Sequence, residues 1–279
     1  MTISPTLTQA FSPVVENNPL GRILVFKAET GISIMNPDGS GQEPLINAPV
    51  GLATLSSDAQ KVVYEFQSEI HVLDLLTNQD TLLYAPGLFP HWSPDTQQIG
   101  FECNEKADWR VCVMNADGTN LRKYGEWSEH QRVTFNDWSS DGNKIVFTLH
   151  TSPPGGGRAR GTIQLLDLMT GEITTLVDET TLANLAWIAN PALSPDNTQL
   201  LFSAKQDEIY SIFSLNLQTR EIQLMENETY NLTNPLWSPD GQFFFAHAET
   251  PLLFTIAGEI LYTLDISGGL VTSWVSSKP

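Results

Sequence analysis

The 279-residue sequence predicts an all-β fold, a six-bladed β-propeller of four-stranded antiparallel blades. Three observations lead to this prediction. A Ser–x–Asp turn followed by an apolar run recurs along the chain, a second turn rich in Asn, Asp and Gly recurs between its copies, and the two alternate with a period of about 43 residues. This period, with four strands per unit, is typical of propeller blades. A β-sandwich would not repeat both turns in register.

The first motif is most complete at 237–241, which reads Trp-Ser-Pro-Asp-Gly. Its other copies are centred on four serines, Ser56, Ser93, Ser139 and Ser194. In every one of these five copies the second residue after the serine is Asp and the sixth is apolar. A weaker additional copy has Asn18 to Gly21 as its turn and Leu24 at the apolar position. Pro, Asp and Gly favour a tight turn, and the unbroken apolar run that follows is typical of a strand covered on both faces.

The second motif reads Ile-Met-Asn-Pro-Asp-Gly at 34–39 and Val-Met-Asn-Ala-Asp-Gly at 113–118. It predicts a third strand that ends in a hairpin turn, and a short fourth strand follows each copy. We therefore expect a single domain over 1–279. Its blades are expected at about 14–46, 51–84, 88–124, 134–177, 189–225 and 233–275.

Two features of this ring have alternatives that the sequence leaves open. Residues 3–10 could add an edge strand to the last blade, or the C-terminal segment could lie beside the first strand. Cys103 and Cys112, the only cysteines, are expected on the two arms of one hairpin and roughly opposite each other. A disulfide is therefore geometrically possible, and two reduced thiols are equally compatible with the sequence.

The composition excludes several classes of function. The formal net charge of −18 would repel a phosphate backbone, so nucleic acid is not an expected partner. No run of 18 apolar residues is present, so no membrane span is expected. Residues 1–9 do not read as a signal peptide. The protein is expected in the cytoplasm, or outside it (the periplasm, for example) if an export signal has been removed, and as a monomer by itself.

The Trp-Ser-Pro-Asp-Gly stretch and the two Met-Asn-x-Asp-Gly turns resemble the WD40-like propeller repeats of the TolB family. The resemblance covers nearly the whole chain. Similar blades occur in tricorn-type proteases, oligopeptidase propellers and oligogalacturonate lyases. The resemblance therefore implies the fold and leaves the activity open.

Antiparallel strand order puts both recurring turns on one face of the ring. The opposite face is expected to carry the longer connections, at 124–132, 150–161, 178–190 and 247–258. Elaborated loops on a rigid scaffold are common binding sites, so a partner is expected there, around blades three to five. Trp127, Trp187 and Phe254 are expected in these loops, where they would either meet a partner or pack the loops down.

The other candidate binding residues lie near the channel or in the loops. His91 and Asp137, on neighbouring innermost strands, would face the channel, as ligands or as polar groups in contact with water. Arg158 and Arg160 follow a run of three glycines that lacks the features of a phosphate-binding loop, and they would meet an anionic group or the carboxylates of Glu126 and Glu129. The remaining candidates are Arg132, Asn190 and Asn234.

The sequence thus predicts a non-catalytic binding or scaffold propeller that presents its long loops and channel mouth to another protein. No nucleophile elbow, metal-ligand spacing or cofactor motif is present, so neither catalytic residues nor a cofactor nor a metal site is expected. The alternative is a lyase or hydrolase that acts on an acidic saccharide, with His91 and Asp137 in the channel.

Overall fold

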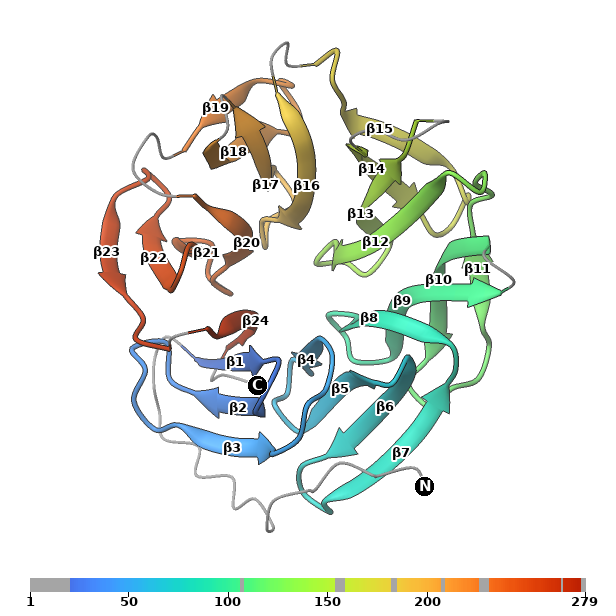
Figure 1. Cartoon of the computed structure of the whole chain (residues 1–279), viewed down its shortest axis with the longest axis vertical. Coiled ribbons are helices and arrows are strands. Elements are labelled where there is room, and N and C mark those ends of the chain that lie inside the picture. The colour runs from blue at the N-terminus through green and yellow to red at the C-terminus, as the bar shows by residue number, and fades with distance from the viewer. Residues whose placement is uncertain are drawn as a thin grey trace.

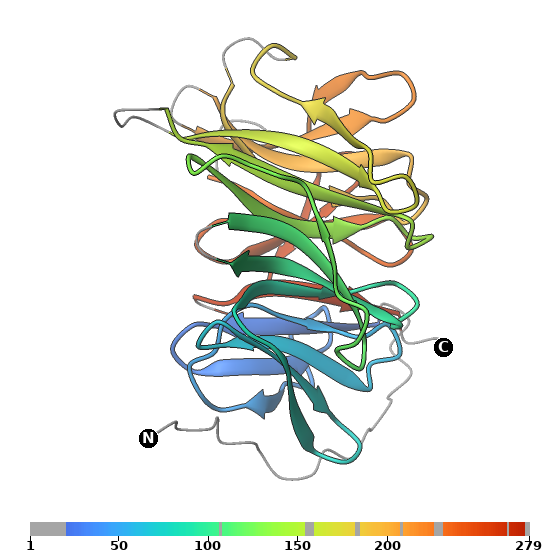
Figure 2. The ribbon, with the colours of Figure 1, turned by 90° about the vertical axis from the view of Figure 1, so that its right-hand side faces the viewer.

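A computed structural model describes residues 21–105, 108–153, 159–181, 185–206, 209–225, 231–266 and 268–276. Within these residues the chain forms six four-stranded antiparallel sheets arranged around a central axis, which confirms the predicted six-bladed propeller (Figure 1). The strands of every blade cross the molecule between two opposite faces (Figure 2). Among the described residues there is no helix, and hence none that could span a membrane.

In five blades the strands follow chain order from the axis outward. The second blade contains β4 (Ala53–Leu55), β5 (Lys61–Phe66), β6 (Glu69–Asp74) and β7 (Gln79–Tyr84). The third contains β8 (Gly87–Trp92), β9 (Gln98–Glu105), β10 (Asp108–Asn115) and β11 (Arg122–Tyr124). The fourth contains β12 (Gln131–Trp138), β13 (Lys144–Thr151), β14 (Arg160–Asp167) and β15 (Ile173–Val177). The fifth contains β16 (Ala186–Leu193), β17 (Gln199–Gln206), β18 (Ile209–Asn216) and β19 (Ile222–Leu224). The sixth contains β20 (Thr233–Trp237), β21 (Phe243–His247), β22 (Pro251–Thr255) and β23 (Ile260–Thr263).

The first blade closes the ring with strands from both ends of the chain. It contains β24 (Leu270–Val275), β1 (Arg22–Lys27), β2 (Gly31–Met35) and β3 (Glu43–Ile46), in that order from the axis. The expected sixth blade, 233–275, is therefore too long by β24, because the C-terminal strand pairs with β1 instead. Gly21, with φ +85°, permits this closure, since a Cβ there would lie 2.0 Å from the carbonyl oxygen of Val275.

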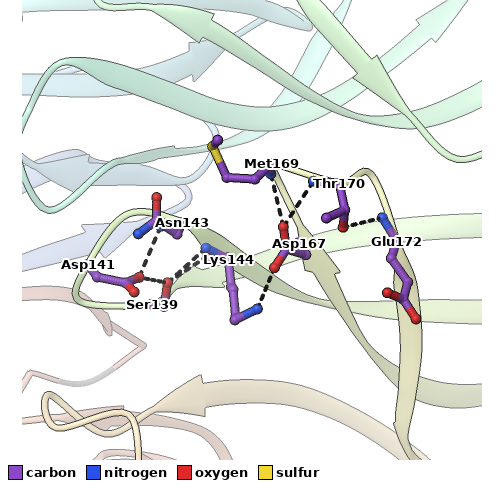
Figure 3. A network of polar contacts seen from close by, with 8 residues as sticks. All are labelled: Ser139, Asp141, Asn143, Lys144, Asp167, Met169, Thr170 and Glu172. Atoms are coloured by element: carbon purple, nitrogen blue, oxygen red, sulfur yellow. Dashed lines mark hydrogen bonds and ion pairs between the residues drawn. The ribbon is translucent and has the colours of Figure 1, made fainter.

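The recurring Ser–x–Asp motif is a hydrogen-bonded hairpin turn. In the fourth blade the Ser139 hydroxyl donates to Asp141 Oδ1 at 2.6 Å and accepts the amide of Lys144 at 2.8 Å (Figure 3). The second turn is tied to the first, because Lys144 Nζ donates to Asp167 Oδ2 at 2.6 Å. That contact holds the pKa of Asp167 down at about 2. The short polar motifs thus satisfy the backbone groups of both turns on one face, which we call the turn face.

Removing one of these serines should destabilise the protein measurably. Ser56 is fully buried, donates to Asp58 Oδ1 and accepts the amide of Lys61, so Ser56→Ala leaves a part-buried amide without its acceptor. We expect the free energy of unfolding to fall by about 1–3 kcal/mol in urea denaturation. The neighbouring Ser57 is exposed, and Ser57→Ala should stay within about 0.5 kcal/mol of the wild type. Equal losses in the two variants would contradict this role of the motif.

The core lies between neighbouring blades. The apolar runs after each turn are buried on both faces, as in Ile145, Val146 and Phe147 of β13, whose side chains are all 0% exposed. Cys103 on β9 and Cys112 on β10 form a disulfide, with their Cα atoms 5.8 Å apart. They are diagonal rather than directly opposite neighbours, because Cys103 pairs with Arg110 in the ladder and Cys112 with Phe101.

Candidate functional site

A cavity of about 500 Å³ occupies the centre of the ring. The innermost strands of all six blades line it, and its lining reaches from the turn-face residues Pro94 and Pro195 to Leu52 and Asn234 at the other end of these strands. That opposite face carries the connections between blades, and we call it the loop face. The cavity joins the two faces, so its loop-face mouth adjoins the segments that the sequence singled out.

The channel wall has different side chains in different blades. The residue just before the strand-ending Trp or Leu is Thr54, His91, Asp137, Ala192 or Leu236 in blades two to six, and all five line the cavity. At this position the polar side chains lie together in blades two to four and the apolar ones in blades five and six. The Ser–Asp hydrogen bond of the turn is 2.6 Å long in each of these same five blades.

Asp137 bonds its own blade to the next. Its Oδ1 accepts the amide of Trp138 at 2.8 Å, and its Oδ2 accepts the amide of Leu193 in the fifth blade at 2.9 Å. Burial raises the pKa of Asp137 to about 7, and the two amide donors offset only part of that shift. This carboxyl group can therefore exchange a proton with a ligand near neutral pH, and it also supports the channel wall.

His91 lies on the neighbouring innermost strand. Its ring stacks on Phe135 with centroids 5.3 Å apart, and its backbone oxygen accepts the indole N–H of Trp138 at 3.4 Å. Burial lowers the pKa of His91 to about 4, so its imidazole is neutral at physiological pH. His91 and Asp137 thus both line the cavity, where the sequence predicted them, and they offer a neutral imidazole and a carboxyl of raised pKa.

Asn190 and Asn234 meet at the loop-face end of the channel. Both line the cavity, and Asn190 Nδ2 donates to Asn234 Oδ1. Their φ angles are +54° and +50°, a conformation that Asn tolerates better than most residues. Phe89 occupies the equivalent place in the third blade with φ +51°, which is unusual for a bulky side chain. Two of the predicted residues are therefore brought together across the fifth and sixth blades.

The predicted loop aromatics pack onto the propeller. Trp127 meets Phe147 edge to face at 5.7 Å, and Trp187 meets Tyr210 in the same way at 5.1 Å. Trp187 lies in strand β16, so its placement in a loop was wrong. The range 247–258 was also wrong as a loop, because it contains β22. Phe254 in that strand is fully buried.

The arginines differ from one another in what they contact. Arg160 pairs with the carboxylate of Glu179. The arginine therefore meets a carboxylate, as one of the two predicted alternatives had it, but the predicted partners Glu126 and Glu129 were wrong. Arg158 lies outside the described residues. Arg132, at the start of β12, lies 3.6 Å from Glu102 Oε2 and stacks on the ring of Trp109.

Sequence reasoning missed Glu102, Trp109 and His150. Glu102 is 0% exposed on β9, and Thr134 Oγ1 lies 3.2 Å from His150 Nε2. The sequence does contain a signal for Glu102. It is an ionisable residue between Phe101 and Cys103, in a strand expected to be buried on both faces, and buried ionisable groups often have a function. Within the described parts of the chain, no three His, Cys, Asp or Glu side chains come together as a set that could hold a metal ion.

Comparison with known proteins supports the fold. No family model and no curated protein sequence matches the chain. Among solved structures, TolB from Acinetobacter baumannii is similar with a TM-score of 0.70 and 17% identity, over 91% of this chain and 67% of that one. A putative TolB from Agrobacterium tumefaciens gives 0.68 and 15%, over 92% and 94%. An oligogalacturonate lyase in complex with manganese gives 0.57 and 16%, over 80% and 70%. At these identities the likeness shows a TolB-type propeller fold.

Proposed function

We propose that this TolB-type propeller is a non-catalytic scaffold that binds a protein partner through its loop face and the adjoining mouth of the channel. The scaffold is rigid, because each blade is a four-stranded sheet whose two faces pack against its neighbours. A partner that binds a preformed surface loses little conformational entropy in ordering it. TolB proteins share this architecture.

One observation carries the proposal. The Ser–Asp hydrogen bond of the turn recurs in five blades, whereas the residues at one equivalent channel position differ in all five. Thr54 and Asp137 also hydrogen-bond to the next blade, through Pro90 and Leu193, but the repeat itself sets no residue type at that position, and this diversity supports a recognition role. The mouth formed by Leu52, Phe89, Asn190 and Asn234 is likewise irregular, which suits one partner in one orientation.

The experiment compares substitutions of two leucines that lie on opposite faces of the ring, Leu52 at the loop face and Leu76 on the turn face. Leu52→Arg introduces a long charged side chain where the cavity meets the loop face, and Leu76→Arg introduces the same side chain on the turn face, where Leu76 is 55% exposed. Partners are captured from an extract of the source cells with each immobilised protein. We expect Leu52→Arg to lose at least tenfold of the captured partner and Leu76→Arg to lose less than twofold, with melting temperatures close to the wild type. The reverse order would place the binding surface on the turn face and contradict the proposal.

A second function is favoured by His91 and Asp137, which line the same cavity. The fold is shared with an oligogalacturonate lyase whose structure contains manganese, so an enzyme acting on an acidic saccharide would use these two side chains. Because the described residues offer no set of three metal donors, we rank this function second. Calorimetric titration with Mn²⁺ tests it: tight binding that His91→Ala abolishes would support the enzyme, and the absence of heat would count against a metal-dependent one.

A further inference from the structure

Arg132 lies at the loop-face end of β12, two residues before Thr134, which lines the cavity. Its guanidinium carbon stands 4.5 Å above the centre of the Trp109 ring. The side chain is 48% exposed, whereas that of Glu102 below it is 0% exposed. Stacking on an indole fixes the plane of the guanidinium without using its N–H groups, so these donors can point toward solvent.

Hydrogen bonding distinguishes Arg132 from the other arginines of the described chain. Each of the others donates to a carboxylate, an amide oxygen or a backbone oxygen, namely Arg22 to Gly41, Arg110 to Asp108, Arg122 to Gln98, Arg160 to Glu179 and Arg220 to Leu176. Among the described residues the carboxylate within ion-pair reach of Arg132 is that of Glu102, and it lies 3.6 Å from one terminal nitrogen of the guanidinium, farther than in those hydrogen bonds. Its guanidinium therefore has donors available for a ligand.

Glu102 does not neutralise Arg132. Both of its carboxyl oxygens are buried, and the donors near them, on Phe135, Thr134 and Arg132, favour its charged form without reaching ordinary hydrogen-bond geometry. Burial raises the pKa of Glu102 to about 8, and the nearby Arg132 charge offsets only part of that shift. At neutral pH the group is mainly an uncharged acid. Burial also raises the pKa of Glu65, the second carboxyl group that the charge of Arg132 acts on, so the arginine is only partly balanced in a protein whose formal net charge is −18.

We propose that Arg132 binds a carboxylate group of the protein partner at the loop-face mouth of the channel. This inference rests on the proposed function, and it assigns to that partner an acidic side chain or a free C-terminus. A guanidinium presents two parallel N–H groups that match the two oxygens of a carboxylate. Thr134 and His150 lie beside it, and burial together with the charge of Arg132 lowers the pKa of His150, so that its imidazole is neutral and can donate or accept a further hydrogen bond.

A spectroscopic titration tests the site without the partner. The Nε–H resonances of the arginines are followed by NMR while small probes are added at millimolar concentration. N-acetyl-glycylglycine supplies a C-terminal carboxylate, the α-amide of N-acetyl-aspartate supplies a side-chain carboxylate, and N-acetyl-glycylglycinamide supplies neither. We expect one or both carboxylates to shift the resonance that disappears in Arg132→Gln, and the neutral amide to leave it in place. No shift at Arg132, or an equal shift at Arg122, would overturn the proposal.

Binding of the captured partner separates this inference from the proposed function. Arg122 is the matched control, because it is also an arginine over an aromatic ring, 5.9 Å from the centre of Tyr124, and it lies at the turn-face end of β11. We expect Arg132→Gln to weaken partner affinity about tenfold to a hundredfold and Arg132→Lys to recover part of it, while Arg122→Gln stays within about twofold. If Arg132→Gln binds like the wild type and Leu52→Arg still abolishes binding, the carboxylate contact is wrong and the protein-binding function stands.

Discussion

Replacing Trp274 by alanine is expected to lower the free energy of unfolding by about 3–5 kcal/mol, the typical loss for a buried aromatic side chain. Trp274 lies on β24, is 7% exposed and packs against Phe245 with ring centroids 5.0 Å apart. The same cluster contains Ile23 and Val25 of the first blade. The indole therefore fills the space between the first and last blades, and its loss leaves a cavity at the seam of the ring.

Three further altered proteins distinguish closure of the ring from ordinary packing of the core. Trp274→Phe keeps most of the buried area and should recover more than half of the loss in urea denaturation. Gly21→Ala should destabilise the protein although it removes no contact, because the added methyl group would lie 2.0 Å from the oxygen of Val275.

A chain ending at residue 268 lacks β24, which exposes the inner edge of β1, and it should not unfold cooperatively. A truncated chain as stable as the full one would contradict closure by β24.

Asp137→Ala is expected to be the most destabilising substitution of a polar residue in the channel wall. It leaves the amides of Trp138 and Leu193 without their acceptor, at a cost of about 1–3 kcal/mol for each amide. Asp137→Asn should be milder, because one oxygen remains to accept one of the two amides. Thr54→Ser keeps a hydroxyl on the same wall and serves as the control, with a change within about 1 kcal/mol. Equal stability of Asp137→Ala and the wild type would show that the bond between blades four and five contributes nothing.

The pH dependence of that comparison has a definite sign. Burial raises the pKa of Asp137 to about 7 in the folded state, against about 4 in an unfolded chain, so the folded protein binds the proton more tightly. The stability of the wild type relative to Asp137→Asn should therefore fall as the pH rises from 4 to 7. His91 and His247 act in the opposite direction, because burial lowers the pKa of each to about 4. Glu102 acts in the same direction as Asp137, because burial raises its pKa to about 8. All three groups are present in both proteins, so the difference in stability between the wild type and Asp137→Asn isolates Asp137.

The fold was predictable from sequence because its determinants are local. A serine, an Asp two residues later and an apolar residue at the sixth place define a turn and the strand after it within one short window, and the turns form as expected at Ser139 and its counterparts. The period then fixes the number of blades. The exchange of β24 into the first blade was undetermined by the same reasoning, because the two ways of closing the ring are equivalent in a repeating pattern.

The candidate site was predicted less completely, since it depends on contacts between distant strands. Placing His91 and Asp137 on innermost strands needed only the repeat, and the structure puts both on the cavity wall. The pairing of Asn190 with Asn234, and the position of Glu102 beneath Arg132, depend on the register and twist of neighbouring blades. Phe254 was misplaced because the connection before β22 is only three residues long, and the sequence gives no sign of so short a turn.

Amide hydrogen exchange of the complex with the captured partner tests the central claim most directly. If the loop face and channel mouth form the binding surface, the partner should slow exchange in peptides covering 125–134 and 231–236. Peptides that cover the turns at 93–98 and 139–144 should exchange at the rate of the free protein. Protection confined to those turns, with the loop-face peptides unchanged, would contradict the account.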